Sequence, residues 1–263
     1  TNTNTNTNTN TNTNTNTYND NDNGCKMKDL VTFGTNWNML PSKNAVIFTD
    51  NHDTQRTSSN VMTYKQGINY NFANYFMLAH PYGTPKIMSS YYFENEDQGP
   101  PDKRIYSTTQ PYQDLNNCND NINYVCEHRR KGILTMIKFR IETKNENISN
   151  FITDDVNPNR IAFSRGNKGF FAINMDLVYN WSIANVDTNL LDGKYCNVMT
   201  SDSDSDSDNN SNNVNVKEIS SSTSCSEGDD NVVEVINGKI QQLELGVMSA
   251  FALHTGAMVN INN

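Results

Sequence analysis

The feature that most constrains the fold of this chain is a change in the spacing of its apolar residues near residue 150. Before that point, short apolar runs alternate with stretches in which apolar residues recur every three or four positions. After it, seven short runs are separated by turn residues. Strands and helices in alternation are typical of a parallel α/β unit, whereas closely spaced short strands indicate an antiparallel sandwich or Greek-key domain. We therefore expect an α/β part followed by an all-β part.

Individual elements follow from length and periodicity. A four-residue run that breaks into polar residues predicts a buried strand, and a helical repeat that stops before Pro81 predicts a helix end. The first part is expected to contain a strand at Ala45–Phe48, a helix over Ile68–Ala79, a strand at Lys86–Tyr91 and a helix over Ile133–Ile141. The second part is expected to contain strands at Arg160–Phe163, Gly169–Asn174, Trp181–Ala184, Lys194–Met199, Val232–Ile236, Lys239–Leu245 and Ser249–His254. The boundary falls between Thr143 and Arg160, and we place it after residue 150.

Low-complexity stretches reduce the length of chain that can form a core. Residues 1–17 alternate Thr and Asn, residues 201–208 alternate Ser and Asp, and residues 209–224 are mostly Asn and Ser. Such segments bury too little apolar surface to offset the entropy of ordering them. We expect residues 1–24 to form a disordered tail and residues 201–224 a disordered insertion.

The charge and hydropathy of the chain exclude some classes of partner. A net charge of −9 without any Lys/Arg run disfavours nucleic acid, which needs a basic footprint. A neutral substrate such as a glycan fits this balance. No apolar run approaches the roughly 18–20 residues that span a bilayer, and no apolar core of a signal peptide lies near the start. Because the first residue is Thr1 and not Met, we expect further sequence upstream.

The five cysteines leave two interpretations open. None of them lies in a C-x-x-C pair of the kind that binds zinc. They are either buried or free thiols, or they form two short-range disulfides that imply an oxidising compartment. The disulfide interpretation pairs Cys118 with Cys126 and Cys196 with Cys225, and leaves Cys25 over.

Five strings of residues point to a known family. The polar segment Asn51-His52-Asp53, taken alone, is no more than a loop after a strand. The wider string at residues 48–56, FTDNHDTQR, resembles the last conserved segment of the α-amylase family, F-V-D-N-H-D. Similar family strings follow in the same order at residues 77–83 (MLAHPYG), 87–91 (IMSSY), 125–129 (VCEHR) and 163–170 (FSRGNKGF). The resemblance covers roughly Phe33 to His254 and is closest to the animal-type, chloride-activated branch.

This resemblance implies a fold and an activity. Ala45–Phe48 and Lys86–Tyr91 become the seventh and eighth strands of a (β/α)8 TIM barrel, residues 25–150 the C-terminal part of its catalytic domain, and residues 151–263 the C-terminal β-sandwich. The family hydrolyses internal α-1,4-glucosidic bonds of starch and glycogen. The implied partner is therefore an α-glucan, and the implied location is extracellular or a secretory, lysosome-like compartment.

The resemblance also assigns roles to single residues. Asp53 matches the carboxylate that stabilises the transition state at the cleavage site, and His52 matches a neighbouring sugar-binding histidine. The alternative for both residues is a capped, solvated loop. Asn51 and Lys86 match two chloride ligands, although many members have Arg at the second position. Lys carries a compact point charge, whereas Arg can form two parallel hydrogen bonds to an anion. The alternative role for Lys86 is therefore a cation in the barrel core.

Several family features have no counterpart here. Nothing resembles the segments that carry the nucleophile and the general acid, and the family's calcium ligands lie in those same regions. Arg130 stands where the family usually has Trp. Three hypotheses follow: a fragment of an α-amylase that is inactive alone, a non-catalytic module whose sandwich binds glucan through exposed aromatics such as Trp181 or Tyr195, and a degenerate, poorly soluble remnant. For Trp181, the alternative is a Trp buried in the core of the sandwich.

Overall fold

The computed structural model describes residues 26–57, 60–100, 124–199 and 225–259. The predictions of a disordered tail at residues 1–24 and a disordered insertion at residues 201–224 lie outside the described residues, as do Cys25 and Cys118. No helix in the described ranges is both long and apolar enough to cross a membrane.

A four-stranded antiparallel sheet forms the centre of the molecule. Its strand order is β10-β5-β4-β3, with β3 at Ile148–Thr153, β4 at Arg160–Arg165, β5 at Gly169–Asn174 and β10 at Ser249–His254. Every residue of β4 and β5 is buried. Burial on both faces explains why these strands read as continuous apolar runs with little polar alternation.

Two further strand pairs cover one face of this sheet. β6 (Trp181–Asp187) pairs with β9 (Lys239–Leu245), and β7 (Gly193–Cys196) pairs with β8 (Val232–Val235), both antiparallel. Their inward side chains pack against Phe170, Ala172 and Leu253 of the central sheet in one apolar cluster. The all-β part is thus the antiparallel sandwich that the sequence predicts.

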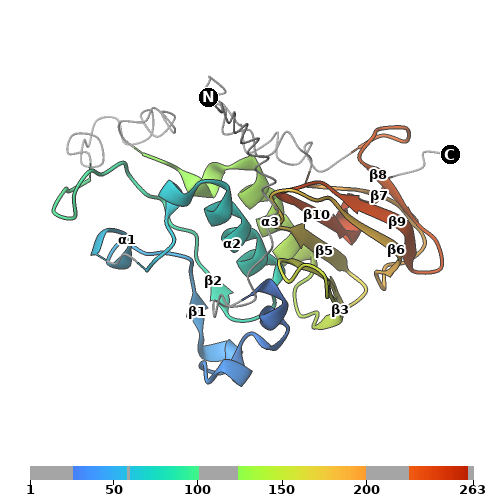
Figure 1. Cartoon of the computed structure of the whole chain (residues 1–263), viewed down its shortest axis with the longest axis horizontal. Helices are drawn as coiled ribbons and strands as arrows, with labels where there is room; N and C mark the ends of the chain where they lie inside the picture. Colours follow the sequence, from blue (N-terminus) through green and yellow to red (C-terminus); the bar gives the residue numbers. More distant parts are fainter. Residues whose placement is uncertain (1–25, 58–59, 101–123, 200–224, 260–263) are drawn as a thin grey trace, which may run out of the picture.

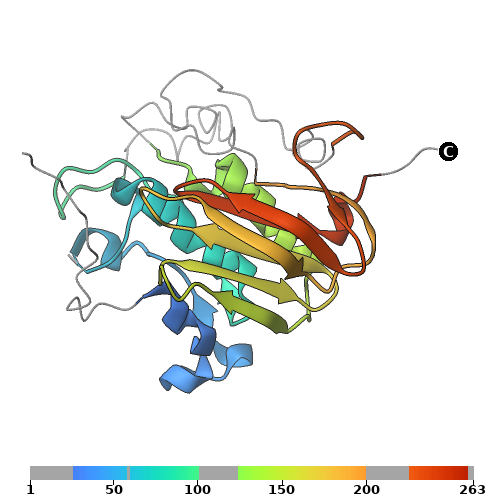
Figure 2. The ribbon, with the colours of Figure 1, turned by 45° about the vertical axis from the view of Figure 1, so that its right-hand side comes forward.

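Two helices cover the opposite face. α2 (Ile68–Ala79) and α3 (Lys131–Glu142) lie side by side against the sheet (Figures 1 and 2). Phe72, Phe139, Phe163 and Phe171 belong to one buried cluster shared by helices and strands. The helices therefore complete the core of the sheet and do not form a core of their own.

A buried arginine, Arg165, and a half-buried one, Arg140, close the C-terminal end of α2. Arg165 on β4 donates to the carbonyl oxygens of Ala79 and, at 3.0 Å, of Thr143. Arg140 on α3 donates to His80, to Pro81 at 3.0 Å and to Gly83 at 2.6 Å. Cations at a helix C-terminus satisfy its free carbonyl groups and favour its dipole. Burial lowers the pKa of Arg165 to about 10, so the side chain stays charged near neutral pH.

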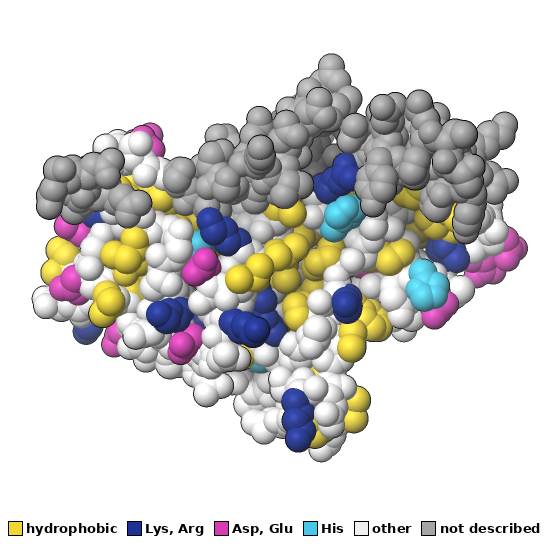
Figure 3. All heavy atoms as spheres, turned by 180° about the vertical axis from the view of Figure 1, so that it is seen from behind, with side chains coloured by type: hydrophobic (Ala, Val, Ile, Leu, Met, Phe, Trp, Pro, Cys, Tyr) yellow, Lys and Arg dark blue, Asp and Glu magenta, His cyan; other side chains and the backbone are white. Residues whose placement is uncertain are grey.

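The remaining elements are short. β1 (Val46–Ile47) and β2 (Thr84–Pro85) form a parallel pair, and α1 spans Thr54–Thr57. The 3-10 helices are η1 (Met27–Thr32), η2 (Thr35–Trp37), η3 (Ser42–Asn44), η4 (Tyr64–Gln66), η6 (Glu127–Arg129) and η8 (Thr255–Ala257). The projecting segment before β1 carries apolar side chains at its surface (Figures 1 and 3).

One predicted strand is misplaced. The strand expected at Lys86–Tyr91 is instead β2 at Thr84–Pro85, although the Lys86 amide still donates to Ile47 at 2.8 Å. Beyond that point the chain turns to a different partner, because Val125 donates to the Ser90 carbonyl at 2.9 Å and Tyr91 forms a bridge with Tyr124. The strand ends early because its continuation pairs with residues 124–125.

One strand has no counterpart among the predicted runs. β3 contains the polar Ser149 and Asn150 and is interrupted by a register shift, so its pattern is weak. It also crosses the expected division after residue 150. Both expected helices, and the strands at Gly169–Asn174, Lys239–Leu245 and Ser249–His254, are confirmed.

Candidate functional site

The segment that follows β1 is a tightly bonded turn. The Asn51 side-chain oxygen accepts from the Asp53 amide at 3.0 Å, the Thr54 amide at 2.8 Å and the Thr54 hydroxyl at 2.9 Å. This is the way Asn caps a helix N-terminus, and α1 begins at Thr54. The cap fixes the backbone on both sides of His52 and Asp53. We call residues 51–54 the NHD turn.

The NHD turn presents its two functional candidates to solvent. The His52 and Asp53 side chains are 77% and 78% exposed, and His52 Nε2 lies 3.3 Å from Asp53 Oδ1. The pair stands just beyond the C-terminal end of β1, as the sequence predicts. Its exposure leaves both side chains accessible to a ligand.

Beneath the turn lies a buried polar network that sequence reasoning missed. Asp50 accepts from the Tyr70 hydroxyl at 2.9 Å and from the Gln55 amide nitrogen at 2.7 Å. That same nitrogen also donates to Ser90 Oγ, which in turn donates to Glu127. The Ser90 amide donates to the other Glu127 oxygen at 2.7 Å. Two buried carboxylates are thus linked through Gln55 and Ser90.

Burial sets the protonation of this network. It is the largest influence on Asp50 and on Glu127, and it raises the pKa of both carboxyl groups against the opposing hydrogen bonds. Tyr70 has its pKa raised by burial and by Asp50. Neither Asp50 nor Glu127 can reach a bound ligand, since both are closed off from solvent. The only signal in the sequence was their position within the FTDNHD and VCEHR strings, which carried no role for them.

A second set of contacts ties α1 to the loop after Ser90. Arg56 donates to the Tyr91 hydroxyl and, at 3.2 Å, to the Glu96 carbonyl. Its guanidinium also lies 5.4 Å from the centre of the Tyr91 ring, within cation–π range. The helix that follows the NHD turn is therefore anchored on two sides.

The two predicted chloride ligands, Asn51 and Lys86, have different surroundings. Asn51 uses its side-chain oxygen on the cap of α1, and Lys86 is exposed. Within residues 26–57, 60–100, 124–199 and 225–259, the Lys86 ammonium has no hydrogen bond or ion pair. An anion site needs several donors directed at one point, so chloride binding at these two residues stays a prediction.

The described ranges contain no group of three or more His, Cys, Asp or Glu side chains that could hold a metal ion.

The cysteines and the candidate stacking aromatics can be placed in part. Cys196 and Cys225 form a disulfide, and Cys126 is also disulfide-bonded, while its expected partner Cys118 lies outside the described residues. The prediction of an exposed aromatic for stacking on sugars is wrong for Tyr195, whereas for Trp181 the alternative of a buried sandwich Trp is confirmed. Both are buried, because they face the core between the two layers of the sandwich.

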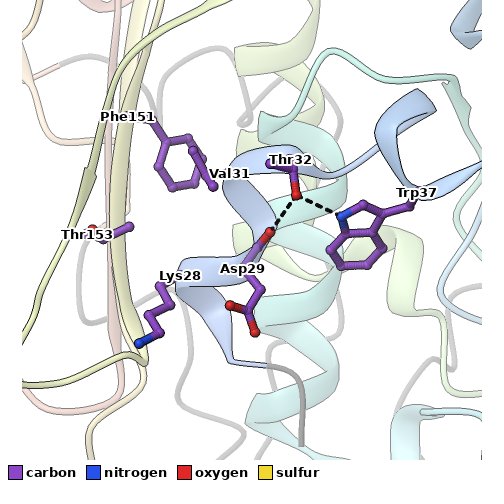
Figure 4. Close-up of a pocket in the computed structure, with 7 residues that line it drawn as sticks. All are labelled: Lys28, Asp29, Val31, Thr32, Trp37, Phe151 and Thr153. Atoms are coloured by element: carbon purple, nitrogen blue, oxygen red, sulfur yellow. Dashed lines mark hydrogen bonds between the residues drawn. The ribbon is translucent and has the colours of Figure 1, made fainter.

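A hollow of about 650 Å³ lies elsewhere, between η1, η2 and β3. Figure 4 shows its lining, in which Trp37 donates to Thr32 at 2.9 Å and Phe151 approaches from the sheet. The other lining residues are Lys28, Asp29, Val31 and Thr153. No residue predicted for the site lines this hollow.

Comparison with known proteins supplies the context of these residues. Residues 151–255 match the family described as "Alpha amylase, C-terminal all-beta domain". Alpha-amylases of Tenebrio molitor and Tribolium castaneum are each 41% identical to the chain, over 181 and 182 residues. These matches cover 68% of this chain and 37% and 36% of the two relatives. An alpha-amylase-related protein of Drosophila willistoni is 40% identical over 174 residues, which cover 66% of this chain and 34% of that protein.

A solved structure extends the match beyond the sandwich. The crystal structure of wild-type alpha-amylase I from Eisenia fetida superimposes with a TM-score of 0.68 at 26% identity, over 89% of this chain and 46% of that one. A mutant of that enzyme in complex with maltohexaose matches with a TM-score of 0.67. The chain thus spans about one third of the length of the curated relatives and about half of the solved enzyme.

Proposed function

We propose that the NHD turn is the sugar-binding part of an α-amylase active site, because the chain belongs to the α-amylase family and corresponds to the C-terminal part of its animal members. Asp53 and His52 bind hydroxyl groups of an α-glucan such as starch or glycogen. The observation that carries this proposal is the exposed, capped His52–Asp53 pair at the C-terminal end of β1. The nucleophile and the general acid belong to the part of the family's length that this chain does not span.

The fold of the first part supports this placement. β1 and β2 are parallel, and α2 follows β1 while α3 follows β2 in the chain. We assign them as the last two strand–helix units of a TIM barrel. In such barrels, catalytic residues stand at the C-terminal ends of the strands, which is the place that Asp53 occupies.

The chemistry of the family limits what the chain does alone. A retaining glycosidase needs a nucleophile and an acid/base carboxyl about 5–5.5 Å apart. Asp50 and Glu127 are buried and cannot act on a glucan, whereas Asp53 faces solvent. Hydrogen bonds to sugar hydroxyls that tighten in the transition state supply several kcal/mol. We therefore assign Asp53 to binding and transition-state stabilisation, and we expect no hydrolysis by this chain alone.

The compartment and the chloride ligands belong to the same proposal. A disulfide between Cys196 and Cys225 favours an oxidising, secretory or extracellular compartment.

Asn51 and Lys86 are proposed as chloride ligands that need further donor groups to complete an anion site. The exposed apolar residues before β1 favour association with another segment or chain. Trp181 and Tyr195 are buried and therefore do not support sugar binding by the sandwich alone.

Calorimetric titration with maltohexaose tests the proposal. Wild-type chain should bind, Asp53→Asn should lower the affinity at least about tenfold, and Asp155→Asn, a matched exposed carboxylate outside the turn, should leave it unchanged. Equal affinities for all three proteins would refute the role of Asp53. Retention on starch of residues 150–263 alone would favour the sandwich as the binding module.

A further inference from the structure

The NHD turn has little local structure to hold it. β1 has two residues and α1 has four. Helices of this length are not stable on their own, because a first turn costs more conformational entropy than its few hydrogen bonds return. The orientation of His52 and Asp53 must therefore depend on contacts made by the residues on either side of the turn.

Gln55 supplies the first of these contacts. It lies two residues after Asp53, is 4% exposed, and its amide nitrogen donates to Asp50, which precedes the turn. This bond closes the NHD turn at its base. The same nitrogen donates to Ser90 Oγ, so the base of the turn is also joined to the chain beyond β2.

Ser90 is in turn held by Glu127. The serine directs both its amide and its hydroxyl at the two carboxylate oxygens, and its carbonyl accepts from Val125 at 2.9 Å. Glu127 is fully buried and follows the disulfide-bonded Cys126. Burying a carboxyl group costs free energy unless strong hydrogen bonds compensate. A buried group with this fixed geometry is a suitable anchor for a polar side chain on another segment.

We infer that Glu127 is a positioning residue, which holds the NHD turn in its ligand-binding orientation through Ser90 and Gln55 without touching the ligand. The inference rests on the proposed function, since it names the device that orients the proposed glucan-binding pair. Each step of the path from Glu127 to Asp53 is a hydrogen bond or a short stretch of chain: Glu127 to Ser90, Ser90 to Gln55, and Gln55 to Asp50 at the base of the turn.

The four histidines of the chain provide a reporter with built-in controls. His52 lies in the turn and is exposed, whereas His80 and His254 are buried in the shared core. A change confined to the turn therefore shifts the His52 ring signals in NMR spectra and leaves those of His80 and His254 in place. A merely structural role for Glu127 in the core would move all three.

The experiment compares variants of the full chain. In Glu127→Ala, amide hydrogen exchange at residues 51–55 should rise at least about tenfold, the His52 signals should shift, and maltohexaose affinity should fall about as far as in Asp53→Asn. Glu127→Gln should restore all three, because its amide can accept from the Ser90 amide and donate to Ser90 Oγ, while the unpartnered Gln55 oxygen is free to accept the Ser90 hydroxyl proton. Glu94→Ala, which removes an exposed carboxylate from the loop after Ser90, is the matched control.

The outcomes separate the two claims. Unchanged exchange at residues 51–55 in a folded Glu127→Ala protein would overturn the positioning role. Should that variant fail to fold, Ser90→Ala breaks the same path, and an unchanged turn there would overturn the inference equally. A loosened turn in the variants together with no maltohexaose binding by wild type would uphold the positioning role and refute the proposed function.

Discussion

The sandwich and the segment around β1 differ in how much of their apolar surface the chain covers by itself. β4 and β5 are buried throughout, because helices cover one face of their sheet and strand pairs cover the other. Around β1, by contrast, Leu40, Val46 and Phe48 are 64%, 59% and 45% exposed. The sandwich is therefore a completed packing unit, whereas the β1 segment keeps apolar surface for further contacts. The proposed glucan-binding pair belongs to the second region.

Core truncation should show the largest contrast between the regions. Phe163 contacts Phe76, Phe151 and Phe171 in the core that joins helices and sheet. Phe163→Ala should lower the free energy of unfolding by about 3–5 kcal/mol, as expected for a buried aromatic residue. Val46→Ala should change it by less than about 0.5 kcal/mol. Urea denaturation of both variants measures the difference, and equal losses would contradict it.

The disulfide should stabilise the sandwich and leave the β1 segment unaffected. Cys196 and Cys225 are 29 residues apart in the sequence, and closing a loop of that length contributes about 3 kcal/mol by restricting the unfolded chain. The double variant Cys196→Ser/Cys225→Ser should lose about that much in denaturant unfolding. Its amide exchange at residues 51–55 should match wild type. A selective loosening of the turn would show that the two regions are coupled.

Acid should destabilise the shared core through its buried histidines. Burial and Lys138 lower the pKa of His254 to about 4, while burial, Arg165 and Arg140 do the same for His80. A folded-state pKa below the unfolded value near 6.5 means that the unfolded chain binds more protons. Stability is thus full above about pH 6.5 and declines towards pH 4, by about 3 kcal/mol for each histidine. His254→Leu should flatten the measured decline, and an unchanged slope would contradict this account.

The network beneath the NHD turn should have the opposite pH dependence and a smaller effect. Burial raises the pKa of Asp50, so its contribution is present at low pH and is lost as pH rises through the folded-state value. Asp50→Asn should remove that loss and change stability at acidic pH by no more than about 1 kcal/mol. Unfolding measured between pH 4 and 8 compares the Asp50→Asn variant with wild type, and an unchanged profile would contradict this account.

The same contrast explains what the sequence could predict. The strands at Gly169–Asn174 and Ser249–His254 were readable because burial on both faces requires continuous apolar runs. Strand β3 was not, since Ser149 and Asn150 interrupt its pattern at a bulge. The position of Asp53 after β1 followed from a local string of residues. The roles of Glu127 and Ser90 did not, because their contact joins residues 37 positions apart and depends on how two loops meet.

The most direct test of the central claim is an NMR titration of the full chain with maltohexaose, followed by analysis of the sugar in the same sample. The account predicts that the signals of residues 51–54, including the His52 ring, shift in a saturable way while the maltohexaose stays intact. Shifts confined to the sandwich, or cleavage of the sugar at the rates of an ordinary amylase, would contradict it.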